Sequence, residues 1–206
     1  MPLSRRVMLR QTLIAAPLLS SELFGPMLRA AEAQAAEEKW YWYPGHSLTF
    51  KSIGKDTGGT CTWMLVENSP QEGVPFHKHL REDESFYVID GQFEITVGEK
   101  TVVGGPGTYM YGPRGVQHRW TNVGSRRGRL LNVFTPSSIE DYFLAVAIPV
   151  ASSSQQPSVD MAVLNARMAP LREKFGLIRT GTTKYSRPGD PSVSNPAGDS
   201  KTSIQK

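Results

Sequence analysis

Two stretches decide how this chain folds. The first is Gly73-Val-Pro-Phe-His77-Lys-His79-Leu-Arg-Glu82-Asp83-Glu84-Ser-Phe-Tyr-Val-Ile-Asp90-Gly91, and the second is Gly107-Thr-Tyr-Met-Tyr-Gly112-Pro113-Arg-Gly115-Val-Gln-His118-Arg-Trp-Thr-Asn122. Together they hold three of the four histidines of the chain. Each alternates β-forming residues with Gly, Pro and Asp, which predicts a strand, a turn and a second strand. We expect these two units to meet in space.

The sequence around these stretches, from about Trp40 to Thr135, is also typical of short strands. Turn residues interrupt it every few positions, and no helical periodicity lies between the turns. Asp90-Gly91 between two alternating runs predicts a hairpin. Many short strands without interleaved helices favour an all-β fold, a small antiparallel double-sheet (jelly-roll) barrel over residues 36–135.

After Thr135 the periodicity becomes helical. Ser138 precedes a short amphipathic segment and is predicted as its N-cap. A second apolar stripe at helical spacing ends before Gly176 and consists of Leu164, Met168, Leu171 and Phe175. Pro170 lies inside this stripe and predicts a break or kink. We expect residues 136–180 to form short helices that pack on the barrel, and residues 181–206, which lack periodicity, to be a disordered tail.

Residues 1–35 have the pattern of an export signal. A basic start is followed by an apolar middle and by small residues at Ala31-Glu-Ala33 and Ala33-Gln-Ala35. The start Ser4-Arg5-Arg6-Val7-Met8-Leu9-Arg10 resembles a twin-arginine signal, which implies the twin-arginine export machinery as a partner. The apolar middle is interrupted by polar residues and predicts no stable membrane span. We expect the protein to be exported, to the periplasm or outside the cell; the alternative is an uncleaved amphipathic helix.

Composition excludes several classes of function. The net charge is +4, and half of it comes from residues 1–35, so the remainder is too weakly basic to indicate a nucleic-acid partner. Cys61 is the single cysteine, which excludes an intrachain disulfide and a thiolate cluster. Any metal must therefore be held by nitrogen and oxygen ligands.

The two stretches supply such ligands in workable register. His77 and His79 are two residues apart, so on a strand both side chains point to the same face. Glu84 would share the inward face of the next strand with the apolar residues Phe86 and Val88. Asp83 would instead place Tyr87 and Ile89 on that face, which stays possible from the residues alone. Glu82 lies one position too early for either register. We therefore choose Glu84, from the neighbouring strand, as the third ligand.

His118 completes the set if its strand runs antiparallel beside that of His77 and His79. Three imidazoles and one carboxylate suit one divalent first-row transition metal, namely Fe, Mn, Ni, Cu or Zn. The alternative is that these histidines are ordinary surface or core residues, because a His-x-His pair also arises by chance.

These residues carry a resemblance to a known family. The two stretches resemble the paired motifs of the cupin superfamily, and the second, from Gly107 to Asn122, matches at every fixed position. The first departs at its leading glycine, whose place is taken by Gln71. The segment Pro136 to Ile178 is similar to quercetin-2,3-dioxygenase-like cupins of the single-domain type.

The resemblance implies a function and its alternatives. It implies a dioxygenase-type oxidoreductase that acts on a small phenolic or enolic compound chelated at a three-His, one-Glu metal site. In such relatives the glutamate, here Glu84, also acts as the base for the substrate hydroxyl; the alternative is that it is only a ligand. A non-enzymatic small-ligand and metal-binding module, or an isomerase, decarboxylase or lyase, would use the same ligands. Dimers are common in the family, and a homodimer is a further implied expectation.

The substrate pocket should be the interior of the barrel. By strand parity its lining residues would be Phe86, Val88, Phe93 and Trp120, although inward aromatic residues in a small barrel are often simply core. Arg114 and Arg119 could recognise a carboxylate or be solvated turn residues. His46 lies outside both motifs and is predicted as a surface residue.

Overall fold

The computed structural model describes residues 38–181. The predicted export signal lies outside the described residues, as does the predicted tail from residue 182 onward. One compact unit begins at Lys39, and it is the unit described below. None of the helices within residues 38–181 is both long enough and apolar enough to cross a membrane.

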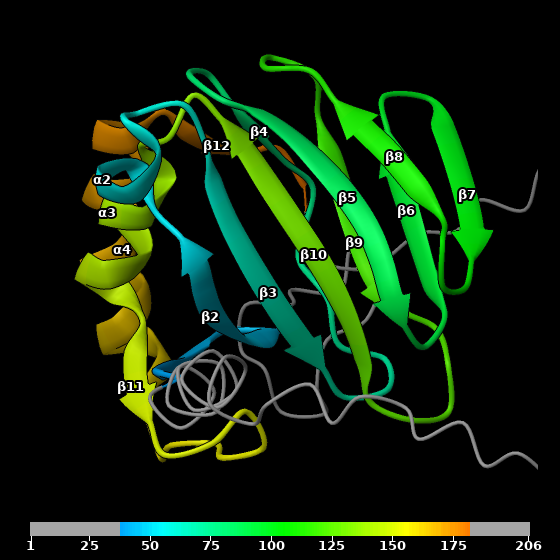
Figure 1. The fold of residues 1–206 in the computed structure, drawn as a ribbon. Coiled ribbons are helices and arrows are strands. Elements are labelled where there is room, and N and C mark those ends of the chain that lie inside the picture. Colours follow the sequence, from blue (N-terminus) through cyan, green and yellow to red (C-terminus); the bar gives the residue numbers. More distant parts are fainter. Residues whose placement is uncertain (1–37, 182–206) are drawn as a thin grey trace, which may run out of the picture. The chain divides into compact units, whose positions relative to one another are not determined.

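Two antiparallel sheets make up most of this unit (Figure 1). The seven-stranded sheet has the order β11(Ile148–Val150), β1(Trp40–Tyr43), β2(His46–Ser52), β3(Thr62–Asn68), β10(Gly128–Thr135), β5(Asp83–Asp90) and β8(Tyr109–Gly112). The five-stranded sheet has the order β12(Leu177–Arg179), β4(His77–His79), β9(His118–Asn122), β6(Phe93–Val97) and β7(Lys100–Gly104). The predicted all-β, double-sheet fold is confirmed.

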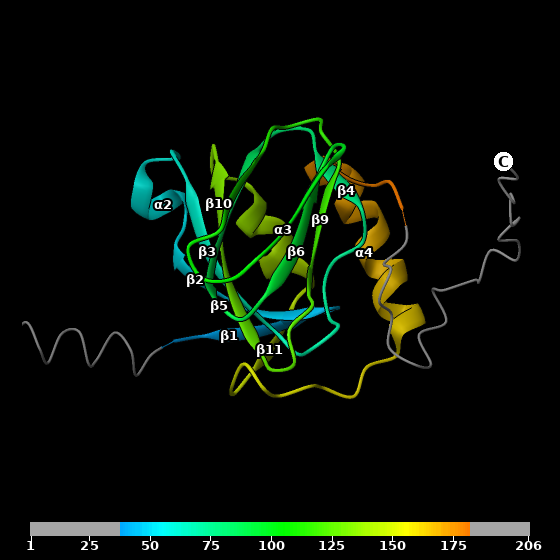
Figure 2. The same ribbon diagram turned by 90° about the vertical axis from the view of Figure 1, so that its right-hand side faces the viewer.

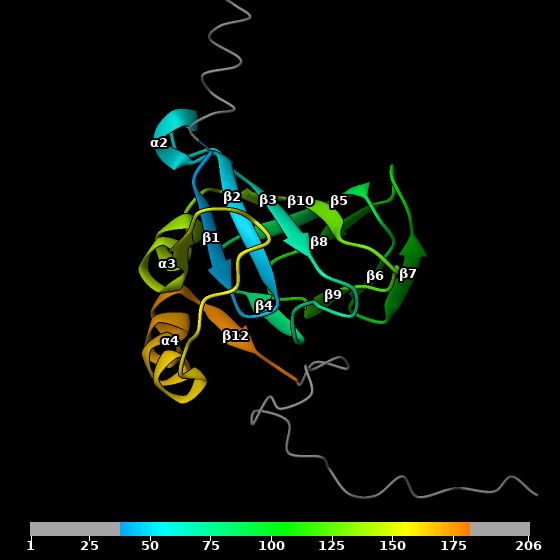
Figure 3. The same cartoon turned by 90° about the horizontal axis from the view of Figure 1, so that it is seen from below.

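The two sheets face each other and enclose the core. Figure 2 shows β10, β3 and β5 on one side and β9, β6 and β4 on the other, and Figure 3 shows the strands as a ring seen from below. The side chains that fill the space include Leu48, Met64, Val66, Phe86, Val88, Phe93, Ile95, Trp120, Leu130 and Phe134. Alternation produces this core, because every second residue of a strand points inward.

Strand β5 shows how the alternation sets the register. Glu84, Phe86 and Val88 are buried, whereas Tyr87 and Ile89 are exposed. The strand pairs with β10 on one side and with β8 on the other, so it is not an edge strand of its sheet. Of the two acids Asp83 and Glu84, Glu84 is therefore the one buried on the inner face of β5.

The predicted hairpin at Asp90-Gly91 is wrong. β5 belongs to the seven-stranded sheet and β6 to the five-stranded sheet, so the turn carries the chain from one sheet to the other. Gly91 has a φ of 87°, and the Asp90 carboxylate accepts hydrogen bonds from the Gly91 amide and from Arg126. The dipeptide marks a turn correctly, but the partners of the flanking strands are decided elsewhere.

Two larger helices, α3(Ile139–Val146) and α4(Met161–Phe175), pack on the barrel (Figure 1). A one-turn helix, α2(Gly54–Thr57), contacts α3, because the Gly54 amide donates to the Glu140 carboxylate at 2.8 Å. Ser138 is at the N-cap position of α3, but its hydroxyl makes no capping hydrogen bond. The predicted break at Pro170 is absent, because α4 runs through it and ends at Gly176. Strands β11 and β12, which flank α4 in the sequence, were not predicted.

The departure at the first motif has a structural cost. Gln71 has a φ of 64° and is the one non-glycine residue within 38–181 in the left-handed region. This is the position where the cupin motif usually has glycine. Gly73 is needed for a different reason: a Cβ there would lie 2.2 Å from the Trp120 carbonyl oxygen. Residue 71 thus has the left-handed backbone that favours glycine although it is a glutamine.

Candidate metal centre

Three histidines converge on the inner face of the five-stranded sheet. His77 and His79 both lie on β4, and β9 runs antiparallel beside it with His77 paired to His118. The centres of the His77 and His118 rings are 4.5 Å apart. This is the arrangement that the spacing of the two stretches predicted.

The carboxylate comes from the opposite sheet. Glu84 lies on β5, which faces β4 across the barrel, so the expectation that it lies on a neighbouring strand is wrong. Its Oε2 atom is 2.9 Å from His118 Nε2, 3.3 Å from His79 Nε2 and 4.0 Å from His77 Nε2.

The four side chains fit a metal ion. Their ligand atoms all lie within 4.8 Å of one another. Glu84 Oε2 and His118 Nε2 are buried and make no hydrogen bond, which is costly for polar atoms unless a ligand satisfies them. Three nitrogen donors and one carboxylate oxygen suit a divalent first-row transition metal.

Backbone carbonyls fix the orientation of two of the rings. His77 Nδ1–H donates to the Pro75 carbonyl at 2.8 Å, and His118 Nδ1–H donates to the Val116 carbonyl at 3.0 Å. Each bond places the proton on Nδ1. Nε2 is then unprotonated, and its lone pair faces the cluster, where it can bind a metal.

The third ring is held by a residue that the sequence did not predict. Glu82 is buried, with Oε2 3.4 Å from His79 Nδ1, and its other oxygen accepts a hydrogen bond from the Ser138 hydroxyl. Sequence spacing excludes Glu82 as a ligand, because it lies one position too early for either register of the strand. It serves the site from behind His79 instead.

Glu84 is also held from the seven-stranded sheet. Asn132 on β10 donates from Nδ2 to Glu84 Oε1 at 2.5 Å, and both side chains are buried. This bond occupies Oε1 and leaves Oε2 directed at the histidines. No motif in the sequence identified Asn132, although β10 pairs with β5 through Asn132 and Phe86.

Burial and neighbouring charges shift the pKa values of His77 and His79 in opposite directions. Burial lowers the pKa of His79, but the carboxylates of Glu82 and Glu84 outweigh it and raise the pKa to about 9. Burial and the neighbouring imidazoles His118 and His79 hold the pKa of His77 well below its usual value. Burial raises the pKa of Glu84, but His118 and His79 outweigh it, and the net pKa is strongly lowered. Without a metal, the added proton therefore belongs on His79.

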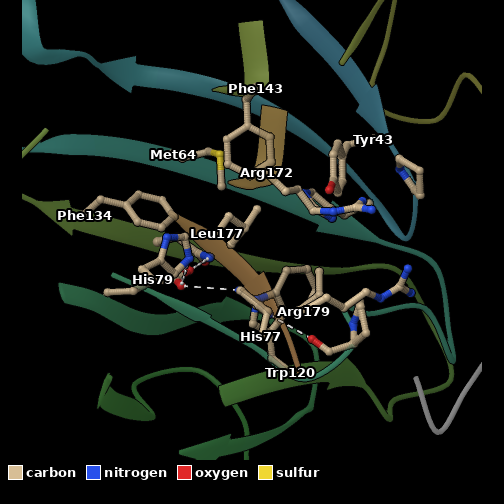
Figure 4. Close-up of a pocket in the computed structure, with 16 residues that line it drawn as sticks. Tyr43, Met64, His77, His79, Trp120, Phe134, Phe143, Arg172, Leu177 and Arg179 are labelled. Carbon is tan, nitrogen blue, oxygen red and sulfur yellow. Dashed lines mark hydrogen bonds and ion pairs between the residues drawn. The ribbon is translucent and has the colours of Figure 1, made fainter. Parts of the chain in front are cut away.

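A pocket opens over the cluster, and Figure 4 shows its lining. His77, His79 and Glu84 are at one part of it, and Met64, Trp120 and Phe134 form apolar walls. Of the four residues predicted by parity, Trp120 lines this pocket, whereas the other three are buried core residues that do not: Phe86, Val88 and Phe93.

His46 is not a surface residue. It is 3% exposed, lines the pocket, and packs against the rings of Tyr43, Trp120 and Phe143. Burial lowers its pKa to about 4, against a smaller opposing effect of Glu72 and Glu84. The alternation of β2 could have placed it inward, since Leu48 has the same parity and is fully buried.

The arginines of the pocket are also not the predicted ones. Arg114 pairs with Asp83 at 2.9 Å and Arg119 with Glu94 at 2.8 Å, so neither faces the pocket. Arg172 and Arg179, from α4 and β12, line it instead. Sequence reasoning had no signal for them, because their place depends on how the C-terminal segment packs.

Comparison with known proteins agrees with this geometry. Residues 64–134 match the family model described as a cupin domain. The match contains all four residues of the cluster and ends at the last residues of β10. Residues from Pro136 onward, including α3, α4 and β12, lie outside it.

One curated relative is quercetin 2,3-dioxygenase of Bacillus subtilis, which is 23% identical over 151 residues, or 73% of this chain. The chain spans only 43% of the length of that relative. Among solved structures, KdgF from Halomonas sp. is 19% identical, with 52% of this chain and 93% of that chain covered and a TM-score of 0.47. A predicted oxalate decarboxylase from Thermotoga maritima is 17% identical, with 49% and 95% covered and a TM-score of 0.47.

Proposed function

We propose, from the premise that residues 64–134 form a cupin domain, that this protein is a metal-dependent oxidoreductase of the dioxygenase type. Its substrate would be a small phenolic or enolic compound. The observation that carries the proposal is the cluster of His77, His79, Glu84 and His118 in a largely apolar pocket. The likeness to a quercetin 2,3-dioxygenase supports the choice of reaction class.

Each residue of the cluster would have a defined task. The three histidines and Glu84 would hold one divalent metal, which, when bound, supplies open coordination positions for substrate oxygens. Glu84 Oε2 would accept the proton of the substrate hydroxyl, because Oε1 is occupied by Asn132. The apolar walls exclude water and would hold a flat ring beside the cluster.

Oxygen uptake tests the proposal. The full chain, loaded in turn with iron, manganese, nickel and copper, should consume dioxygen when a flavonol such as quercetin is added. Glu84→Gln should keep the metal and lose turnover if the glutamate acts as base, whereas His118→Ala should lose the metal. Ligand binding without turnover under every metal would instead favour the non-enzymatic module, and conversion without oxygen uptake would favour an isomerase, decarboxylase or lyase.

We also propose that residues 1–35 direct export of the folded protein by the twin-arginine route. The support is the arrangement of Arg5 and Arg6 before an apolar stretch and small residues. Replacing both arginines by lysine should leave the protein in the cytoplasm of its host, as cell fractionation would show. Normal export of that variant would contradict the proposal.

A further inference from the structure

The pocket has further polar groups besides those of the metal cluster. We infer that His46, Arg172 and Arg179 form an anion subsite, and that the substrate is therefore a small phenolic or enolic acid that carries a carboxylate or a similar anionic group. This inference rests on the proposed function, because it assumes that the substrate also reaches the metal cluster.

The two arginines are available for a ligand. Within residues 38–181 neither forms an ion pair with a carboxylate, in contrast to Arg114 and Arg119. Arg172 lies beside the Tyr142 hydroxyl, a neutral group that leaves its charge uncompensated. Figure 4 shows Arg172 reaching toward Tyr43 and Arg179 near Trp120. Phe134 lies on the opposite side of the pocket in this view. A guanidinium recognises carboxylates well, because its planar N–H groups can donate two parallel bonds.

His46 points to the same conclusion independently. Neither of its ring nitrogens has a hydrogen-bond partner although the side chain is buried. Its neighbours Tyr43, Trp120 and Phe143 contact it with aromatic rings. A buried polar group without a partner is unfavourable, so a ligand that accepts its N–H would relieve that cost. The imidazole lines the pocket, where such a ligand would lie.

The balance of charge favours an anion. A divalent ion held by Glu84 and three neutral imidazoles would leave one positive charge, and the two arginines add two more. The pocket lining also includes the apolar side chains of Met64, Phe134 and Leu177. A molecule that matches this lining has oxygen donors for the metal, an apolar ring and an anionic group.

This subsite is separate from the cupin motifs. Arg172 and Arg179 lie on α4 and β12, and His46 lies on β2, all outside residues 64–134. The shared motifs supply the metal ligands, whereas the flanking segments of this chain supply the groups that would select the substrate.

Two catechol probes that differ in one ring substituent test the inference. Protocatechuate and 4-methylcatechol both chelate metals through a diol and differ in a carboxylate against a methyl group. Titration calorimetry of the full chain loaded with zinc, which undergoes no redox turnover, should show about tenfold tighter binding of protocatechuate. Arg172→Gln with Arg179→Gln should abolish this preference, so that both probes bind with similar affinity, and His46→Phe should weaken it.

Lys174→Gln is the matched control, because it removes one positive charge from the same helix outside the pocket lining. It should keep the preference. Arg179→Gln alone changes an exposed residue and should fold normally, so it tests the subsite even if the double variant misfolds. Equal affinity for the two probes, or an unchanged preference in the double variant, would overturn the inference.

The outcomes separate the inference from the proposed function. If both probes bind equally and His118→Ala abolishes binding, the anion subsite is wrong and the metal site stands. If neither probe binds the zinc-loaded protein, the proposed function fails and the anion subsite fails with it.

Discussion

His79 differs from the other two histidines of the site in the group that holds its Nδ1 atom. His77 and His118 donate to backbone carbonyls, whereas His79 faces the carboxylate of Glu82, which Ser138 in turn holds. A carboxylate behind an imidazole increases its basicity and fixes its orientation. The position of Ser138 therefore affects the metal site although it lies far from it in sequence.

Ser138→Ala should weaken zinc binding about tenfold, because Glu82 loses the donor that holds it. The stability of α3 should hardly change, since the hydroxyl makes no capping bond. Competition against a fluorescent zinc chelator measures the affinity. Ser137→Ala is the control and should bind zinc normally; a loss of helix stability without a change in affinity would show that Ser138 acts as an ordinary cap.

The raised pKa of His79 makes metal binding dependent on pH. The pKa of His79 is about 9, so at lower pH the metal-free site carries a proton on His79, which a metal must displace. His77 contributes no such proton near neutrality, because its pKa is lowered. Zinc affinity should therefore rise about tenfold per pH unit between about pH 6 and about pH 8. Chelator competition at several pH values measures the slope, and a flat profile would contradict it.

Gln71 should be replaceable with a gain in stability. A side chain at a φ of 64° destabilises the folded state by about 1–2 kcal/mol, and glycine removes that cost. Glycine also makes the unfolded chain more flexible, which lowers the free energy of unfolding by about 0.5–1 kcal/mol. Gln71→Gly should thus raise the free energy of unfolding by about 0.5–1 kcal/mol, measured by urea denaturation. Gln92→Gly, at a position without positive φ, should give no gain.

Alternation and spacing predicted the four residues of the cluster because strand parity is a local property. His46 and Glu82 were misjudged for different reasons. His46 has inward parity but lies outside the recognised motifs. Glu82 precedes the strand that carries Glu84, so only the packing of α3 through Ser138 reveals its role. Arg172 and Arg179 depend wholly on tertiary packing.

At the scale of elements, the turn at Asp90-Gly91 shows what local sequence can establish. The dipeptide specifies a change of direction but not the partner of the next strand. β6 pairs with β7 and β9, which are reached later in the chain, and β5 pairs with β10 and β8. Strand partners depend on contacts distant in sequence, and the short helices were easier to predict than the sheet order.

Helix α4 continues through Pro170 because its packing outweighs the local cost. Leu164 and Met168 anchor it on the core. Proline has no N–H to donate to the Ala166 carbonyl, and Ala166 is an exposed residue, so water can hydrate that carbonyl. Pro170→Ala should therefore stabilise the protein by about 1–3 kcal/mol. Thermal unfolding monitored by circular dichroism measures the gain. Pro157→Ala, in the connector before the helix, should give no comparable increase.

At the scale of the molecule, the cluster joins the two sheets. The histidines belong to the five-stranded sheet and Glu84 to the seven-stranded sheet, so a metal would connect them across the core. Since only the folded chain assembles all four ligands, zinc at a hundredfold excess over its dissociation constant should stabilise the fold by about 2.7 kcal/mol.

Thermal unfolding with and without a chelator measures this stabilisation. The zinc-dependent shift of the melting temperature should vanish in His118→Ala, whereas Lys100→Ala on the distant β7 should retain it. A shift of equal size in His118→Ala would mean that zinc binds elsewhere.

Strand β4 pairs with β9 through His77 and His118 alone, but with β12 through three residue pairs, from Leu177 to Arg179. During translation β12 is made long after both histidines of β4 have left the ribosome. A nascent chain that ends before Leu177 therefore lacks the main support of the strand that presents two of the four ligands. A chain truncated before Leu177 should therefore bind zinc more weakly than the full chain, because β4 would lose its three pairs with β12.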